Sequence, residues 1–485
     1  MSIANALNNA ISGLTAASRG TELVSTNLAN SLTPGYARRE LELSPRIHAN
    51  NGGGVHINGV NRIISNTVLS EFRLSSAAVG RSAVTYDFYS KIEAAIGEPQ
   101  NSASLSAMMN EMEAALISAS GRPDSETRLR AVFESAGQLV KKINAISATI
   151  QDTRTNADRL IDKQVDALNE DLNEVSRLNR LIIIEQANNR DSSSLEDARR
   201  GVIDRIASVV PVREVPRENG RIALFTQNGA VLLDGKAPTL LGFEATGALT
   251  PDIDQNSEQL GRLSINGEFA SSFDLSLFAG GSLFELFQLR DDYTITAQAG
   301  IDSIARELHD RFADSAIDTT IPVGGSGLFV DLAGPFDPAN ERGLASRLRI
   351  TPTVDPTQGG QLWRIRDGLN AAAPGDVGDG SILDQLRQVM AATEPFRSDS
   401  APAGLGSVAT LTSTLLSDIS SQRISAETLR THDVTLLTSL QDALLADGVD
   451  SDRELQMLLQ LEKSYAANAK VIQAVNDMLD QILRI

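Results

Sequence analysis

The side chains that most often carry chemistry are few and scattered in this sequence. The chain of 485 residues contains no Cys, which excludes disulfides, thiolate metal sites and Cys nucleophiles. No phosphate-binding loop, dinucleotide-binding glycine motif or nucleophilic serine motif is present. None of the four histidines has a carboxylate at metal-ligand spacing; they are His48, His56, His309 and His432. We therefore expect no catalytic residue, no cofactor and no metal site.

Three other segments contain residue types found in functional motifs, but they lack the order or the surroundings that those motifs require. Gly324-Gly325-Ser326-Gly327 has no strand before it and no helix after it, so it is interpreted as a loop. The acidic stretch from Asp447 to Glu454 has its glycine directly after the first Asp, which is the wrong order for a calcium loop. Asp291-Asp292 has no nucleophile or base associated with it, and helix-surface charge is the better interpretation.

Composition narrows the possible partners. The chain has 43 basic and 62 acidic residues and a formal net charge of -19, so its surface repels nucleic-acid phosphates and anionic lipids. No apolar run approaches the roughly 18 residues of a membrane span. Near the N-terminus, Asn5, Asn8, Asn9 and Ser12 interrupt the apolar residues, so we expect no cleavable signal peptide. Apolar residues make up 41% and aromatic residues only 4%, which favours helices packed through aliphatic side chains.

The first 31 residues carry a heptad pattern of small and apolar side chains. Ala and Thr fill several of these positions and bury little area, so the helix needs a partner to be stable. Its seam consists of Ile3, Leu7, Ala10, Leu14, Ala17, Thr21, Val24 and Leu28.

The C-terminal segment offers such a partner. After the turn at Asp447-Gly448, apolar residues recur at helical spacing in two neighbouring rows, a stripe wide enough to be covered on several sides. An ordinary amphipathic helix that packs on its own domain explains the periodicity equally well. One row is Leu455, Leu458, Tyr465, Ala469, Ile472, Leu479 and Leu483, and the other is Met457, Leu461, Val471, Val475, Met478 and Ile482.

A long helical pattern occupies residues 123–190. Pro123 suits a first helical turn, and the phase of the apolar residues shifts near Thr153, which indicates a stutter or a break. If the helix is continuous, it spans roughly 100 Å and makes the domain a rod. A further helix is expected from about Ser192 towards Pro211.

The middle of the sequence changes to β-type patterns. Short strands are predicted at 222–225 and 231–233, next to the turn pairs Asn228-Gly229 and Asp234-Gly235. Helical periodicity returns over 283–312. A region rich in Gly, Pro and Asp follows over 318–380, with short strands predicted at 347–354 and 362–366, and helices resume from about residue 382.

This nested order predicts a mainly α protein with inserted β structure. The terminal helices, 1–44 and 447–485, are expected to form a coiled-coil inner domain. Segments 45–205 and 285–446 are expected to form an elongated helical domain with short strands and loops, and 206–284 a small β-rich outer domain. Both termini should lie at one end of the molecule.

A hinge is predicted where the first helix ends. Pro34 cannot continue a helix, Gly35 permits positive φ, and Tyr36 offers an anchor. An ordinary helix stop is locally as good an explanation. The predicted hinge motif is Asn27, Asn30, Pro34, Gly35 and Tyr36.

Segments near both ends of the chain resemble one group of proteins. Together they are similar to the end signatures shared by rod, hook and hook-associated proteins of the bacterial flagellum, and two matches in the right order are more specific than one. The segments are Ser12-Gly13-Leu14, Asn27-Leu28-Ala29-Asn30, Thr33-Pro34-Gly35-Tyr36-Ala37-Arg38, Gly448-Val449-Asp450 and the run 461–472.

Within that group, length and the long central helices favour the family of the first hook-associated protein. The segment 195–204 resembles the end of that family's helical rod, although the family commonly reads Asp-Gln-Arg-Asp where this chain has Asp197-Ala198-Arg199-Arg200. The resemblance covers most of the chain, and its specific matches lie at the two ends.

The resemblance implies a structural subunit and not an enzyme. It would be exported by the flagellar type III apparatus with an export chaperone, without a cleaved signal peptide. Outside the cell it would form a ring between hook and filament, binding copies of itself, the hook protein and the second junction protein through its terminal helices. The alternatives are another axial subunit, such as the hook protein or the second junction protein, or a flagellar-borne enzyme or adhesin that uses the β-rich insert.

Overall fold

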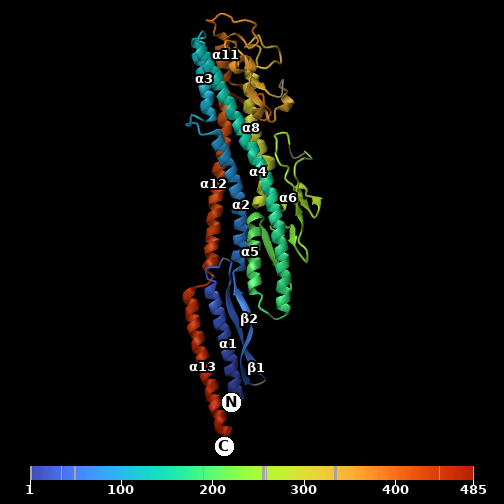
Figure 1. The fold of residues 1–485 in the computed structure, drawn as a ribbon, viewed down its shortest axis with the longest axis vertical. Coiled ribbons are helices and arrows are strands. Elements are labelled where there is room, and N and C mark those ends of the chain that lie inside the picture. The colour runs from blue at the N-terminus through green and yellow to red at the C-terminus, as the bar shows by residue number, and fades with distance from the viewer. Residues whose placement is uncertain are drawn as a thin grey trace.

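The structure, a computed structural model, describes residues 3–33, 35–48, 51–188, 190–253, 257, 259–332, 336–446 and 448–483. Its helices build a long rod, with the N- and C-terminal helices together at one end (Figure 1). The β-rich insert lies along one side of the rod, and a loop-rich segment around α11 (Ser381–Ala391) caps the other end. The architecture is mainly α with inserted β, as the sequence predicts.

The inner end pairs helix α1 (Ile3–Ala29) with helix α13 (Ser451–Leu483), which run antiparallel. Two glycines of α1, seven residues apart, allow the close approach. A Cβ on Gly13 would lie 2.8 Å from Asn468 Nδ2, and one on Gly20 would lie 2.9 Å from Leu461 Cδ2. The facing residues are also seven apart in reverse order, so the contact follows a heptad register.

An antiparallel hairpin packs on the other side of α1. Strands β1 (Arg38–His48) and β2 (Asn51–Ile63) pair from Arg38 opposite Ile63 onward, with register shifts at Glu42/Leu43 and Pro45/Ile47. The backbone N–H of Val55 donates to Ser12 Oγ of α1 at 3.1 Å. The hairpin therefore lies with the terminal helices, and the domain boundary predicted after residue 44 falls inside β1.

Long helices form the body of the rod. Helix α2 (Asn66–Ile96) packs along α12 (Val408–Ala446), and α4 (Glu126–Ala187) packs against α3 (Leu105–Gly121) and α5 (Ser193–Val209). Helix α4 is unbroken over 62 residues, so the alternative of a break near Thr153 is wrong. At 1.5 Å per residue the helix is roughly 93 Å long.

Buried ions on α4 explain the shift in its apolar pattern. Arg154 and Asp158 occupy buried positions where apolar residues would continue the stripe. The Arg154 guanidinium donates to the carbonyl oxygens of Arg290, Thr250 and Ile253 at 2.6–3.1 Å. Asp158 accepts from Arg290 Nη1 at 2.7 Å. The interruption in hydrophobicity therefore marks the contact of the helix with the insert and its return segment.

The insert consists of two small antiparallel sheets. The sequence correctly predicts β4 and β5, and Gly229 in the turn between them has φ 102°. One sheet has the order β3-β4-β5 and the other the order β6-β7-β8. The strands are β3 (Val212–Pro216), β4 (Ile222–Thr226), β5 (Val231–Leu233), β6 (Leu241–Gly242), β7 (Ser264–Ile265) and β8 (Glu268–Phe269), followed by helix α6 (Ser272–Ser276).

The chain returns to the rod through α7 (Ser282–Gln288), a short π-helical segment (Leu289–Tyr293) and α8 (Thr294–Phe312). The strand predicted at 362–366 is wrong, because this segment ends in helix α10 (Arg364–Asp367), with Leu362 and Ile365 buried at helical spacing. The strand predicted at 347–354 is right only for Leu348–Ile350. The other elements there are β9 (Phe329–Asp331), α9 (Leu344–Arg347), β10 (Leu348–Ile350), β11 (Glu394–Pro395) and β12 (Leu405–Gly406), with single 3-10 turns at Pro338–Asn340, Pro352–Val354 and Pro356–Gln358.

A buried carboxylate should give the body a pH-dependent stability. Asp302 of α8 accepts the backbone N–H groups of Gly343 at 2.7 Å and Ala345 at 2.8 Å. Burial raises the pKa of Asp302 to about 6 from 3.8. Because this pKa is higher in the folded state than in the unfolded state, protonation of Asp302 stabilises the fold. This contribution to the free energy of unfolding is complete below about pH 4 and is lost as pH rises through about 6.

We expect Asp302→Asn to remove this dependence. The free energy of unfolding of the wild type, relative to that of the variant, should fall by roughly 2–3 kcal/mol between pH 4 and pH 7. Urea unfolding of both proteins at the two pH values measures the difference. Parallel pH profiles for the two proteins would show that Asp302 titrates normally.

Candidate functional site

The candidate site is the joint where α1 ends and α13 begins. The amide of Asn27, buried at the end of α1, makes four hydrogen bonds there. Its Nδ2 donates to the Arg39 carbonyl oxygen at 2.9 Å and to Glu454 Oε2 at 3.1 Å. Its Oδ1 accepts from the Tyr36 hydroxyl at 2.8 Å and from the Arg39 backbone N–H at 3.1 Å. One side chain thus connects α1, β1 and α13.

A buried ion pair completes the joint. Glu454, in the first turn of α13, is 1% exposed and accepts from Arg38 Nε at 2.6 Å. Burial disfavours the charge on Arg38, but the hydrogen bonds to Glu454 and Glu40 outweigh it and raise the pKa of Arg38. Burial also raises the pKa of Tyr36, so its hydroxyl stays protonated and donates to Asn27. The joint therefore connects the end of α1, the start of β1 and the first turn of α13 through hydrogen bonds and a buried ion pair.

Further ion pairs tie the hairpin to the body. Arg39 Nη2 donates to Asp197 Oδ2 at 2.9 Å, and its guanidinium lies over the Tyr36 ring, 4.9 Å from the centroid. Arg62 of β2 pairs with Glu196 at 2.9 Å and also with Asp197. Since Glu196 and Asp197 belong to α5, these contacts hold the inner end of the molecule against the rod.

The structure brings two of the predicted hinge residues, Asn27 and Tyr36, into contact. Asn30 donates through Nδ2 to the Thr26 carbonyl oxygen at 2.9 Å, and so it closes the last turn of α1. Gly35 has φ 78°, a conformation that favours glycine. Pro34 lies outside the described residues.

The predicted assembly residues divide into two groups. On α1, Val24 is buried, and Ile3, Leu7, Leu14 and Leu28 are half-buried. On α13, the half-buried side chains lie on the side that contacts α1; they are Leu458, Leu461 and Ile472. The exposed side chains are Leu455, Tyr465, Leu479 and Leu483.

Sequence reasoning missed the charged half of the joint. A signal was present, because Glu454 precedes Leu458 and Leu461 by four and seven residues and so lies within the apolar stripe that the two rows of α13 form. An acidic residue in such a row is buried only when it is paired. Nothing in the sequence indicates that Arg38, Arg39 and Arg62 reach partners more than 130 residues away.

No described helix is long and apolar enough to cross a membrane. Nor do three or more His, Asp or Glu residues gather anywhere in the described parts of the chain to hold a metal ion.

The fold and the joint define an elongated structural subunit whose paired terminal helices are fastened to a helical body. Residues 89–316 match the family model of the flagellar hook-associated protein FlgK helical domain, and residues 440–485 match the C-terminal model of the flagellar basal body rod FlgEFG proteins. The chain belongs to the FlgK family of flagellar hook-associated proteins. This is a family of structural flagellar components and not of enzymes.

Relatives extend over nearly the whole chain. Flagellar hook-associated protein 1 of Escherichia coli (strain K12) is 21% identical over an alignment that covers 99% of both chains. The protein of the same name from Bacillus subtilis (strain 168) is 21% identical and covers 98% of this chain and 97% of its own. The solved structure of the flagellar hook junction protein FlgK from Burkholderia pseudomallei has a TM-score of 0.45 and 17% identity, over 54% of this chain and 46% of that chain.

Proposed function

We propose that this protein forms the junction between hook and filament by assembling with copies of itself through α1 and α13. The hook protein on one side and the second junction protein on the other are its proposed neighbours. The proposal also includes export by the flagellar type III apparatus with a chaperone, and residence outside the cell. Membership of the family and the exposed apolar residues of α13 support it.

The distribution of side chains around α13 is the observation that carries the proposal. At 100° per residue, the side that contacts α1 contains Leu458, Leu461 and Ile472. Exposed apolar side chains remain on both flanks of that side, and polar residues occupy the back of the helix. Leu455 and Leu459 lie on one flank, and Met457, Val471, Met478 and Ile482 lie on the other; all are 39–58% exposed.

Such flanks suit a helix with neighbours on both sides. A soluble monomer rarely exposes contiguous apolar surface of this kind unless a partner covers it. Subunits that surround a common axis each have two lateral neighbours, and each neighbour could cover one flank. Leu479 and Leu483 lie close to the C-terminal end of α13, where α1 begins, and offer further apolar area there.

Charges placed on the flanks should block assembly without unfolding the subunit. We expect Leu459→Asp and Met478→Asp to change the free energy of unfolding of the isolated protein by less than roughly 0.5 kcal/mol, because both positions are already exposed. The same variants should lose swimming motility when they replace the wild type in a deletion strain. Gln456→Asp, which places the same charge on the polar back of α13, is the matched control. Normal motility in both flank variants would contradict assembly through this helix.

A further inference from the structure

The inner end and the body are two units with little packing between them. Within the inner end, α1 packs against α13 and against the hairpin, and the buried Asn27 and Glu454 join these parts. Among the described residues, no helix or strand of the inner end packs along a helix or strand of the body. The chain passes between the two units at residues 64–65 and again just before α13, at residues 448–450. Units with so small an interface move relative to each other unless other contacts hold them.

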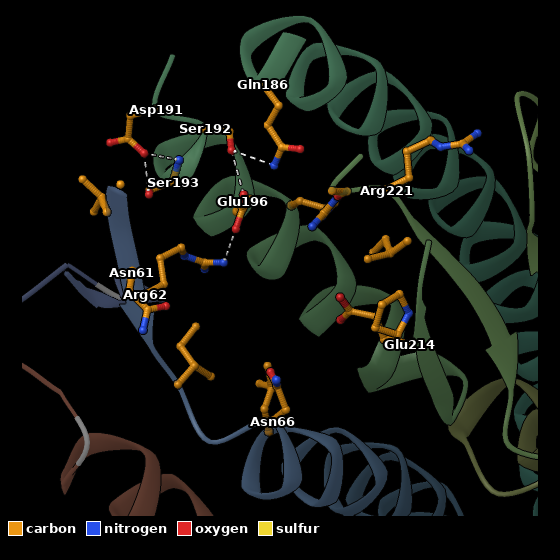
Figure 2. A pocket seen from close by; sticks show the side chains of 18 of the residues that line it. Asn61, Arg62, Asn66, Gln186, Asp191, Ser192, Ser193, Glu196, Glu214 and Arg221 are labelled. Atoms are coloured by element: carbon orange, nitrogen blue, oxygen red, sulfur yellow. Dashed lines mark hydrogen bonds and ion pairs between the residues drawn. The ribbon is translucent and has the colours of Figure 1, made fainter. Parts of the chain in front are cut away.

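Four charged side chains supply such contacts. Figure 2 shows Arg62 of β2 reaching across to Glu196 of α5, and the two side chains are 2.9 Å apart. Arg62 also pairs with Asp197, and Arg39 of β1 lies 2.9 Å from the same carboxylate. All four side chains are at most 22% exposed, so solvent and salt weaken these pairs less than they weaken pairs on the open surface.

The other ion pairs around this region do not cross between the two units. Arg73 of α2 pairs with Asp204 of α5 at 2.7 Å and with Glu214 of β3 at 2.6 Å, and all three belong to the body. Arg38 and Glu454 both belong to the inner end. Within the described residues, the pairs of Arg39 and Arg62 are therefore the ion pairs that connect inner end and body.

A cleft beside these ion pairs gives the inner end room to move. Its volume is about 1210 Å³, and it lies between the hairpin, α2, α5 and the first sheet of the insert. Leu41, Ile57 and Val60 of the hairpin line the cleft and are only half-buried. A tilt of the inner end toward the body would close the cleft and remove more of this apolar surface from water, which is favourable.

We propose that Arg39, Arg62, Glu196 and Asp197 form a latch that sets the angle between the inner end and the body. When the latch opens, the inner end tilts into the cleft about the two chain crossings at 64–65 and 448–450. Each unit keeps its own structure in this hinge motion, and only the direction of the terminal helices relative to the rod changes. The inference concerns the isolated subunit and does not depend on the proposed assembly.

Distances between spin labels on the two sides of the cleft test the latch in the full-length protein. Because the chain has no Cys, His56→Cys on the hairpin and Glu218→Cys between β3 and β4 provide the two label sites. Both positions are exposed. With the latch intact, double electron–electron resonance should give one narrow distance distribution.

The decisive variant is Asp197→Ala, which removes the carboxylate shared by both arginines. It should raise the population at shorter distances by about tenfold or more. Asp197→Glu keeps the charge and should retain the narrow distribution. Asp204→Ala, on the same helix, removes a partner of Arg73 within the body and is the matched control; it should leave the distribution unchanged.

A second label pair reports on folding. Glu218→Cys and Lys163→Cys both lie in the body, and their distance should stay the same in every variant. Arg62→Gln opens the latch from the hairpin side and should repeat the result of Asp197→Ala, so a folding defect in one variant leaves the other as a test. An unchanged distribution across the cleft in the latch variants, or a broad one with the latch intact, would overturn the latch. A shift to longer distances alone would overturn the tilt into the cleft.

Discussion

Replacing Glu454 with Ala is expected to abolish incorporation of the chain into flagella. Glu454 is buried and accepts hydrogen bonds from both Arg38 and Asn27. Its loss leaves the Arg38 guanidinium at the joint with only the more exposed Glu40, at 2.6 Å, as a carboxylate partner. Removing one partner from a buried ion pair typically costs about 3–5 kcal/mol, and this cost falls on the connection that orients α13.

Two companion variants separate the roles of charge and shape at this position. Glu454→Gln keeps an acceptor for Asn27 but removes the charge that pairs with Arg38, so it should give an intermediate defect. Glu462→Ala removes an exposed carboxylate from the same helix and should assemble normally. Motility of a complemented deletion strain and recovery of the chain in isolated hooks measure the outcome. Normal incorporation of Glu454→Ala would show that the joint does not orient the helix.

The second large effect is expected in the body of the rod, from Asp158→Ala. Asp158 is fully buried; it accepts from Arg290 Nη1 at 2.7 Å and from the Thr246 backbone N–H at 2.6 Å. The variant leaves this N–H without an acceptor and leaves Arg290 with Asp291 as its partner. We expect the free energy of unfolding to fall by roughly 3–5 kcal/mol.

Asp162, one turn further along α4, provides the matched control. It is half-buried, and Asp162→Ala should change the free energy of unfolding by less than about 0.5 kcal/mol. Urea unfolding followed by circular dichroism compares the two variants with the wild type. A small effect of Asp158→Ala would mean that the insert contributes little to the stability of the rod. Hydrogen exchange over residues 241–265 would then be unchanged as well.

The joint and the flanks of α13 have complementary roles in the proposed assembly. Within one subunit, Asn27 and Glu454 fix where α13 leaves the body. Between subunits, the apolar flanks would supply buried contact area, and this kind of contact does not require fixed directions as hydrogen bonds do. A loss at the joint should therefore change the direction of the helix, whereas a charge on a flank removes affinity and leaves that direction intact.

Several features of this protein were determined by local sequence alone. The heptad seam of α1, the apolar rows of α13 and the turn pairs of the insert predict their elements because periodicity and turn chemistry act over a few residues. The paired end signatures identify the group of flagellar axial proteins. The gathering of both termini at one end follows from the nested order of the elements.

Tertiary structure decided how charged residues are used. A phase shift near Thr153 indicates either a break or a stutter, and only the contacts of Arg154 and Asp158 with the insert explain why α4 continues. Likewise, the segment 362–366 has the pattern of a strand but ends in a helical turn, because that turn buries Leu362 and Ile365.

The joint, too, depends on contacts between segments that are distant in the sequence. Arg38 and Glu454 are 416 residues apart, and although the position of Glu454 among apolar residues indicates a paired charge, nothing near it in the sequence indicates that Arg38 is the partner. A buried ion becomes stable only when its partner arrives from another part of the chain, and the local sequence contains no information about that distance. The sequence therefore determined which helices form and which faces are apolar. The fold determined which charges are buried and, through them, how the terminal helices are fastened to the rod.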